Sequence, residues 1–164
     1  MISIRVAQES DWPQVWGVLE PVFRAGETYP QDPAITADEA RPGWMEVPDA
    51  TYVALDAQDA VVGTYYIKAN QQGLGAHVCN CGYAVQAQAR GQGIAARMCE
   101  HSQQEALRMG FRAMQFNLVV STNESAVRLW TRMGFQKVGV LAGAFRHSRH
   151  GYVDAFVMYK ILVA

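Results

Sequence analysis

Hydrophobic and polar residues alternate over Ile2–Val6, which is the pattern of a half-buried strand. Apolar residues then recur at helical spacing, at Val15, Val18, Leu19, Val22 and Phe23. Ser10 is expected to cap this helix and Asp11 to favour its positive end, while Pro21 should kink or end it. A second, short helix is predicted over Thr36–Met45.

The middle of the chain favours three strands. Thr51–Leu55 and Ala60–Ala69 flank a turn at Asp56–Asp59, and His77–Val85 follows a glycine-containing turn. Short connections of this kind join neighbouring antiparallel strands. The segment therefore predicts a three-stranded antiparallel meander.

The second half of the chain alternates helices with strands. Helices are predicted at Ile94–Met109 and Asn123–Met133, and each is closed by a glycine, Gly110 and Gly134. The predicted strands are Ala113–Val120, Gln136–Leu141 and Tyr152–Val163. This order is typical of an α/β (α+β) fold around a mixed sheet.

Composition narrows the possible class of protein. The 164 residues are 50% hydrophobic and 18% charged, as in a soluble globular protein of one domain, residues 1–164. The net charge of -1 argues against nucleic acid as a partner. Apolar runs are too short to span a membrane, and the start lacks a signal-peptide pattern. We therefore expect no membrane association and a cytoplasmic location.

The cysteines number three, which makes a disulfide framework improbable in a chain without an export signal. Cys79 and Cys81 would project from one face of a strand, on the same side as His77. A zinc site is an open alternative, but the spacing of familiar structural zinc sites is missing. Buried thiols are the favoured interpretation, with no metal site.

A glycine-containing loop between a strand and a helix carries the main chemical signal, in Val85, Arg90, Gly91, Gln92, Gly93, Ile94 and Ala95. Two glycines let successive backbone N–H groups turn toward one point, and the helix N-terminus favours an anion there. Arg90 can bind phosphate oxygens as a bidentate fork. The loop is neither a P-loop nor a dinucleotide fingerprint. It predicts a phosphate cradle, with an ordinary strand-to-helix turn as the alternative.

Two motifs together resemble a known family. Arg90-x-x-Gly93-x-Ala95 is similar to the Arg/Gln-x-x-Gly-x-Gly/Ala signature of the GCN5-related N-acetyltransferase (GNAT) superfamily. The segment from Asn117 through Asn123 and Leu129-Trp130 to Gly134-Phe135 resembles the second half of that signature. The resemblance implies a single GNAT domain, with a mostly antiparallel sheet of about seven strands flanked by about four helices.

The resemblance also implies a co-substrate and a reaction. Acetyl-coenzyme A would be bound through its pyrophosphate by the loop residues Arg90 to Ala95, and through its pantetheine amides by the Val85 backbone. An amine would then attack the acetyl group directly. The family commonly has a tyrosine after Leu129 as the acid, whereas this chain has Trp130, whose N–H is no practical acid.

Three asparagines are expected near the reaction centre: Asn80, Asn117 and Asn123. Their arrangement resembles that of the azetidine-2-carboxylate (proline-analogue) N-acetyltransferases. By that resemblance Asn80 and Asn117 would hold the acceptor or a water, and Asn123 would contact the pantetheine or the acetyl carbonyl. The alternatives are that Asn80 satisfies a buried bulge and that Asn123 is only a helix cap.

The acceptor is expected to be a small-molecule amine, an amino acid or its analogue. Glu27 and Tyr29 lie in the loop where relatives cover the substrate, so Glu27 either holds a cationic amine or is simply solvated. A basic cluster near the last turn, Arg146, His147, Arg149 and His150, is expected to be a solvated loop. A protein acetyltransferase and a non-catalytic acetyl-coenzyme A sensor remain alternatives. The final strands leave open pairing as a homodimer.

Overall fold

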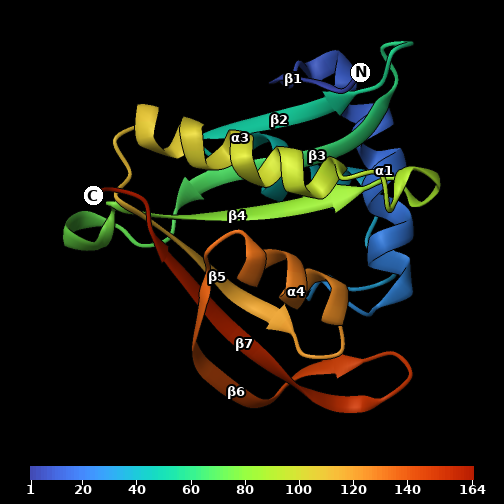
Figure 1. The fold of residues 1–164 in the computed structure, drawn as a ribbon. Coiled ribbons are helices and arrows are strands. Elements are labelled where there is room, and N and C mark those ends of the chain that lie inside the picture. The colour runs from blue at the N-terminus through green and yellow to red at the C-terminus, as the bar shows by residue number, and fades with distance from the viewer.

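A seven-stranded sheet organises the computed structural model, which describes residues 1–164 (Figure 1). The strand order is β1-β2-β3-β4-β5-β7-β6, and only the β4–β5 pair is parallel. The strands are β1 (Ser3–Val6), β2 (Ala50–Leu55), β3 (Val61–Ala69), β4 (Val78–Val85), β5 (Ala113–Val120), β6 (Gln136–His147) and β7 (Gly151–Ile161). The predicted mixed, mostly antiparallel sheet is confirmed.

Four α-helices cover the two faces of this sheet: α1 (Trp12–Ala25), α2 (Ala37–Arg41), α3 (Ile94–Arg108) and α4 (Glu124–Arg132). In Figure 1, α3 and α4 lie in front of the sheet and α1 lies behind it. Each face has its own core because side chains alternate along every strand. Tyr65 and Cys81 belong to the α3 face, whereas Val53 and Ala84 pack with α1.

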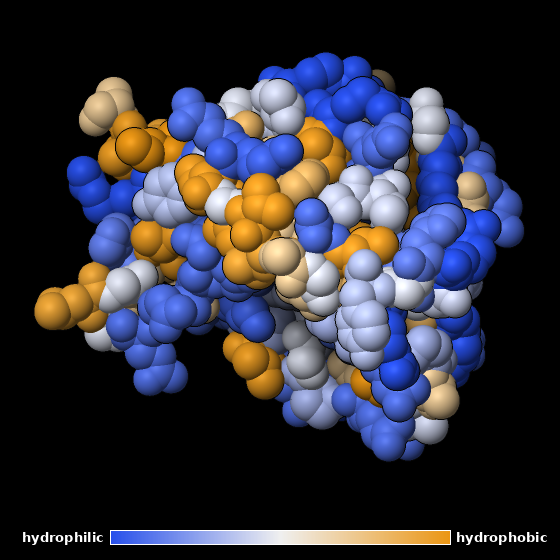
Figure 2. Space-filling view, turned by 90° about the horizontal axis from the view of Figure 1, so that it is seen from below, coloured by the Kyte–Doolittle hydropathy of each residue, from blue (hydrophilic) through white to orange (hydrophobic).

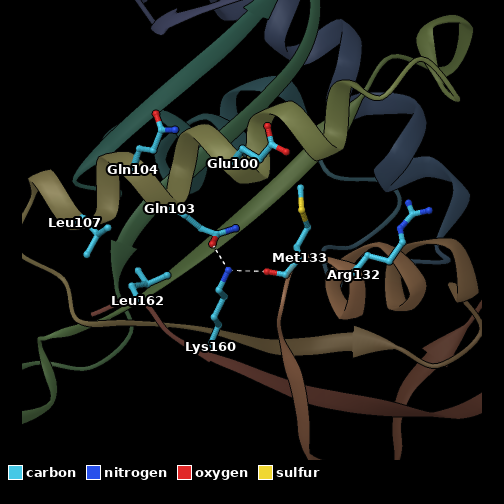
Figure 3. A pocket seen from close by; sticks show the side chains of 8 residues that line it. All are labelled: Glu100, Gln103, Gln104, Leu107, Arg132, Met133, Lys160 and Leu162. Carbon is cyan, nitrogen blue, oxygen red and sulfur yellow. Dashed lines mark hydrogen bonds between the residues drawn. The ribbon is translucent and has the colours of Figure 1, made fainter. Parts of the chain in front are cut away.

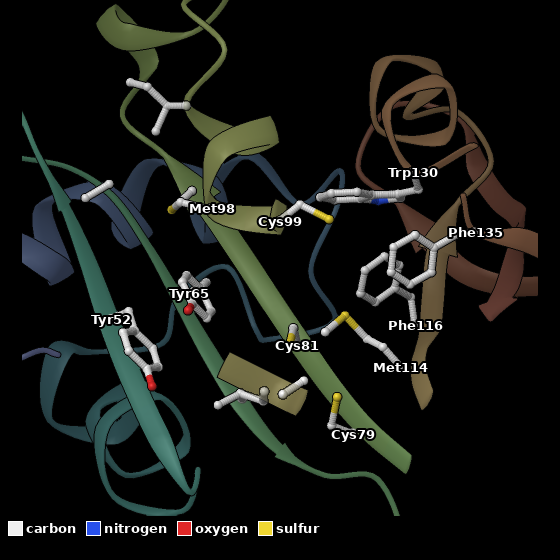
Figure 4. Packing of buried hydrophobic residues seen from close by; sticks show 14 of the residues in the cluster. Tyr52, Tyr65, Cys79, Cys81, Met98, Cys99, Met114, Phe116, Trp130 and Phe135 are labelled. Atoms are coloured by element: carbon white, nitrogen blue, oxygen red, sulfur yellow. The ribbon is translucent and has the colours of Figure 1, made fainter. Parts of the chain in front are cut away.

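Sulfur atoms and aromatic rings fill the core on the α3 face. Cys79, Cys81, Cys99 and Met98 lie among Tyr52, Tyr65, Phe116, Trp130 and Phe135 (Figure 4). The three cysteines are buried free thiols. This agrees with the expectation of small buried side chains, and no group of three His, Cys, Asp or Glu side chains is placed to hold a metal ion.

The start of α1 differs from the sequence prediction. Ser10 lies within a short 3-10 turn, and Asp11 occupies the N-cap position of α1. The Asp11 carboxylate is bound elsewhere, by both guanidinium nitrogens of Arg5 at 2.7 and 2.9 Å and by the Gln8 N–H at 2.7 Å. Ser10 therefore does not cap the helix.

The Asp11 ion pair should make stability depend on pH. Hydrogen bonding to Arg5 holds the pKa of Asp11 below its usual value, against the opposing effect of burial. Its contribution is therefore complete above the unfolded pKa of about 3.9 and is lost as the pH falls through the lower, folded pKa. We expect Asp11→Asn to lower unfolding free energy by roughly 1–2 kcal/mol at neutral pH.

The difference from the wild type should shrink as the pH falls below about 4, measured by denaturant unfolding across pH. Glu124→Gln is the control, because Glu124 pairs with Arg128 at 3.4 Å on the exposed surface and should matter little. A deficit in Asp11→Asn that stayed constant down to pH 2 would contradict the assignment.

Pro21 neither ends nor interrupts α1, which continues to Ala25 and ends at Gly26 in the left-handed conformation (φ 61°). Pro21 removes the N–H that would bond the Gly17 carbonyl, but both residues lie on the exposed side of the helix, where water can take its place. Val22 and Phe23 are buried, and their packing holds the last turn in place. Of the two predicted effects of Pro21, a kink or a helix end, the helix end is wrong.

The last hairpin is longer than predicted and reaches back to α1. Strand β6 runs to His147 rather than Leu141. At the hairpin tip, Ser148 donates from its N–H to the Gly26 carbonyl (3.0 Å) and from its hydroxyl to the Ala25 carbonyl (2.7 Å). The end of α1 and the hairpin tip, which are far apart in sequence, are therefore fixed together.

Strand β6 forms one edge of the sheet, and β1 forms the other. Seen from below, the molecule mixes hydrophobic and hydrophilic residues (Figure 2). Val138 and Val140 of β6 are both more than half exposed.

None of the helices combines the length and hydrophobicity that crossing a membrane would require.

Candidate active site

The glycine loop before α3 presents a row of free backbone N–H groups. Gly91 and Gly93 both have positive φ, 78° and 77°, which non-glycine residues rarely adopt. Helix α3 begins at Ile94, and no backbone or side-chain acceptor binds any N–H from Gly91 to Ala96. Free amides at a helix N-terminus are an anion site, and the exposed Arg90 adjoins them.

A third glycine sets how closely this helix approaches the sheet. Gly63 of β3 faces α3, and a Cβ added there would lie 3.0 Å from the Met98 methyl and 3.1 Å from Ile94 Cγ2. Both of these α3 residues are fully buried against the sheet. The first turn of α3 is therefore fixed against β3, so that its free N–H groups have a defined position.

Strands β4 and β5 separate after a short paired segment. Their parallel pairing comprises Val78 with Ala113 and Cys79 with Met114, and no later residues pair. On its other side, β4 pairs with β3 along its whole length. The C-terminal halves of β4 and β5 thus diverge and leave a gap between two neighbouring strands.

The unpaired edge of β4 faces this gap. The Asn70 N–H donates to the Val78 carbonyl and the Gln86 N–H to the Val62 carbonyl, so the even-numbered residues of β4 bond to β3. Hydrogen-bonding direction alternates along an antiparallel strand. The N–H and C=O groups of Cys81, Tyr83 and Val85 therefore point into the gap. The Tyr83 carbonyl already accepts from Tyr29, and the groups of Val85 can pair with an extended ligand.

Side chains bridge the narrow end of the gap. Asn80 is buried, and its Nδ2 donates to the Gln115 carbonyl of β5 at 2.9 Å. This bond takes the place of strand pairing where β4 and β5 begin to part. The Tyr29 hydroxyl donates to the Tyr83 carbonyl at 2.9 Å, which brings the loop after α1 to the edge of β4.

Aromatic rings line the α4 side of the gap. Trp130 is buried, with its ring centroid 5.0 Å from that of Tyr83 and 5.0 Å from that of Phe116. Figure 4 shows Trp130 and Phe116 beside the sulfur atoms of Cys99 and Met114. At the position after Leu129, the indole of Trp130 therefore packs in the core.

The Tyr83 hydroxyl is also held in place, 2.7 Å from the Ser102 hydroxyl. Burial raises the pKa of Tyr83 well above its ordinary value, so this phenol stays protonated at neutral pH. It is thus a hydrogen-bonding group of the site rather than a ready base.

The three asparagines do not form one cluster. Asn80 and Asn117 are linked through Gln115, which accepts from Asn80 at its carbonyl and donates from Nε2 to Asn117 Oδ1 at 2.9 Å. Asn117 is exposed and donates to Asn70 Oδ1 at 2.6 Å. Asn123 instead accepts from the Ala126 N–H at 3.4 Å as the N-cap of α4. Asn123 thus has the helix-cap contact that the sequence left as an alternative.

Glu27 is partly exposed and forms an ion pair with the hairpin tip. Its Oε1 lies 2.6 Å from Arg149 Nη2 at the β6–β7 hairpin tip. His147, two residues earlier, is buried and accepts at Nδ1 from the Arg149 N–H at 3.1 Å. Arg146, Arg149 and His150 are exposed, as expected for a solvated basic loop, whereas His147 is buried and Arg149 contacts the loop after α1. Nothing in the local sequence pattern indicates this long-range pairing.

Two residues absent from the sequence-based site lie next to Asn80. Tyr66 donates to Asn80 Oδ1 at 3.4 Å, and Lys68 is the β3 partner of Asn80 in the strand register. Gly82 makes room for Tyr66, because a Cβ there would lie 2.6 Å from Tyr66 Cε1 and 3.0 Å from the Tyr29 hydroxyl. Strand alternation puts Tyr66 and Lys68 on one face of β3, and the register with β4 puts Asn80 on that same face.

An open groove of about 380 Å³ lies elsewhere, between the later turns of α3, the end of α4 and β7. Lys160 donates there to the Met133 carbonyl at 2.7 Å and to Gln103 Oε1 (Figure 3). None of the residues predicted for the site lines it. It is distinct from the glycine loop and from the gap between β4 and β5.

Comparisons with known proteins agree with this geometry. The sequence profile of the acetyltransferase (GNAT) family matches residues 12–135. N-acetyltransferase aca1 of Schizosaccharomyces pombe is 33% identical over 148 residues, which cover 80% of this chain and 71% of that protein. A GCN5-related N-acetyltransferase structure from Kribbella flavida is 41% identical, with a TM-score of 0.92 and coverage of 98% of this chain and 97% of that one.

A more distant structure was determined with the co-substrate. A phosphinothricin acetyltransferase from Sinorhizobium meliloti, in complex with AcCoA, is 20% identical, with a TM-score of 0.87 over 99% of this chain and 89% of that one. At this identity the similarity concerns the fold.

Proposed function

This chain belongs to the acetyltransferase (GNAT) family and is an acetyl-coenzyme A-dependent N-acetyltransferase, and we propose that its acceptor is the amine of a small molecule, an amino acid or its analogue. The single observation that carries the assignment of the site is the free N–H row from Gly91 to Ala96 beside the open edge of β4. The N–H row provides an anion site and the edge of β4 provides a strand to pair with, so one extended molecule could bind to both.

The glycine loop and β4 fit acetyl-coenzyme A by the chemistry of their donors. The N–H groups from Gly91 to Ala96 would hold the pyrophosphate, together with the Arg90 guanidinium. The Val85 N–H and C=O would pair with the pantetheine amides. Asn123 would contact the pantetheine or the acetyl carbonyl from the first turn of α4.

When bound, acetyl-coenzyme A supplies an activated thioester: the amine nitrogen bonds to the carbonyl carbon, the carbon–sulfur bond breaks, and sulfur leaves with the electron pair. The amine must be neutral to attack, and its proton passes to water or to the departing sulfur. A thiol of pKa about 8.5 can leave as the thiolate, so the chemistry does not require a tyrosine at the position of Trp130.

The acceptor would approach from the face of Asn80 and Asn117. Asn80 joins β4 to β5 at the narrow end of the gap and Tyr29 bonds to the edge of β4, so both would be positioning groups for an amine there. Asn117 would orient the acceptor or a water through its amide. Glu27 would act by fixing Arg149 and the hairpin tip beside the acceptor. The resemblance to proline-analogue N-acetyltransferases supports an amino acid or analogue as substrate.

Release of the coenzyme A thiol from acetyl-coenzyme A tests this function across a panel of amino acids, proline analogues, polyamines and short peptides. We expect release that depends on small amines. Turnover of peptides alone would instead establish a protein acetyltransferase. Binding of acetyl-coenzyme A without release by any acceptor would favour a sensor, and would contradict the proposal.

Arg90→Ala should weaken acetyl-coenzyme A binding by about tenfold or more, because a charge-assisted bond to phosphate is lost. Acceptor affinity should change less. Isothermal titration calorimetry with acetyl-coenzyme A measures the effect, and Arg108→Ala at the other end of α3 is the control. An unchanged dissociation constant in Arg90→Ala would refute the role of this side chain.

A further inference from the structure

Lys68 places a cation beside the proposed acceptor position, and we propose that it binds a carboxylate of the acceptor. This inference rests on the proposed function and narrows it to amines that carry a carboxylate, with α-amino acids as the simplest class. The acceptor would thus be recognised through its negative charge as well as through its amine.

The strand register places Lys68 on the acceptor face. Lys68 of β3 is directly opposite Asn80 of β4, so both side chains emerge from the same face of the sheet. Asn80 in turn bonds to the Gln115 carbonyl across the gap at 2.9 Å. Lys68 is therefore one strand away from the point where β4 and β5 diverge, on the same face as Asn80.

The Lys68 amine is directed back along β3, over the ring of Tyr66. Its Nζ lies 5.3 Å from the centre of the Tyr66 ring. Tyr66 is two residues back along β3, opposite Gly82, and its hydroxyl donates to Asn80 Oδ1 at 3.4 Å. The ammonium group thus lies over a ring that itself contacts Asn80 and the Gly82 backbone.

No carboxylate of the chain neutralises this ammonium group. Every ion pair in the structure is made by an arginine, and none involves Lys68. Asp49, from the segment before β2, binds the neighbouring Ala69 N–H at 3.0 Å with its carboxylate. Lys68 is also half-buried, where a charge pair is screened less than on an open surface.

The other groups on this face suit a carboxylate. Gln115 and Asn117 contribute amides, which supply neutral hydrogen bonds but no further charge. One ammonium matches the single negative charge of a carboxylate, whereas phosphate is typically bound by arginine forks or a helix N-terminus. The glycine loop already provides that second type of site for the co-substrate.

The test compares binding of free α-amino acids with binding of their carboxamides. Calorimetry is performed on the protein saturated with coenzyme A, for the wild type, Lys68→Gln and Lys68→Arg. We expect the wild type to bind at least one amino acid about tenfold or more tightly than its carboxamide. Lys68→Gln should abolish this preference, and Lys68→Arg should retain most of it.

Lys137→Gln is the matched control, because Lys137 also holds its amine over an aromatic ring, that of Phe156 at 3.8 Å, but on β6. It should bind both ligand series as the wild type does. Equal binding of amino acids and carboxamides by the wild type, or no binding of either, would overturn the inference. A preference that survives in Lys68→Gln would overturn it too.

Binding and turnover separate this inference from the proposed function. Thiol release with amines that lack a carboxylate, without any Lys68-dependent preference, would leave the small-molecule acetyltransferase intact and remove the role of Lys68. A Lys68-dependent preference in binding without thiol release would keep the role of Lys68 and remove the small-molecule acetyltransferase activity.

Discussion

Replacing Gly93 with valine is expected to weaken acetyl-coenzyme A binding by well over tenfold. This is the largest loss of co-substrate affinity that we expect from a single substitution. Gly93 has φ 77° at the N-cap of α3, and a β-branched residue is a genuine outlier there. The chain must either accept this strain or rotate the peptide, and rotation would turn the free N–H groups on either side of Gly93 away from a common point.

The same residue allows a graded test by calorimetry. Asparagine tolerates the left-handed conformation better than alanine, and alanine better than valine, so affinity should fall in the order Asn, Ala, Val at position 93. A steric clash with the rest of the protein does not cause this loss of affinity, since nothing lies within 4 Å of a Cβ added at position 93. The fall from alanine to valine therefore reports on backbone conformation rather than on a clash within the protein.

Gly110→Val is the matched control at the other end of the same helix. Gly110 has φ 89° and an equally open Cβ position. Both variants should lose a similar amount of stability, about 1–2 kcal/mol, while only the variant at position 93 loses the co-substrate. An equal loss of affinity in both would mean that helix stability, not the loop, controls binding.

Gly82→Ala should be the most damaging small substitution on the acceptor side. An added Cβ would lie 2.6 Å from Tyr66 Cε1, far inside van der Waals contact. The Tyr66 ring cannot easily move, because it packs edge-on against Trp44 with ring centroids 4.8 Å apart. Overpacking of this kind costs about 1–3 kcal/mol.

The activity of Gly82→Ala should fall as well. The added methyl would also lie 3.0 Å from the Tyr29 hydroxyl, which bonds to the Tyr83 carbonyl at the gap. We expect a raised KM for the acceptor, with acetyl-coenzyme A affinity less affected. Thermal unfolding and steady-state kinetics with the best acceptor of the panel measure the two effects.

Gly139→Ala serves as its control, since the nearest atom to an added Cβ on β6 is 3.9 Å away, an ordinary contact. It should change stability and activity little. If Gly82→Ala were as stable and as active as Gly139→Ala, Tyr66 would have to be far more mobile than its packing indicates.

Local sequence patterns predicted the elements and the glycine loop well. A strand was predicted at His77–Val85, after a glycine-containing turn, and is observed at Val78–Val85; helical spacing with a closing glycine predicted the helix that begins at Ile94. The loop chemistry depends on neighbours in sequence, namely two glycines before a helix. These features are encoded within a dozen residues, so they could be found without knowledge of the fold.

The parts that were missed depend on contacts between distant segments. The extension of β6 to His147 and the pairing of Glu27 with Arg149 arise only when the hairpin tip meets the end of α1. Pro21 was overvalued as a helix breaker because burial of Val22 and Phe23 outweighs its local preference. Lys68 could be related to the site only once its register with Asn80 was known.

The alternating hydrogen bonds of β4 also limit which insertions and deletions this part of the chain can accept. A one-residue insertion within β4 would exchange the residues that bond to β3 with those that face the gap, and would reverse every side chain at once. The turn from Asn70 to His77 is under no such constraint, and Leu74 at its tip is fully exposed. Length variation among descendants of this sequence should therefore accumulate in that turn and spare the strand that follows it.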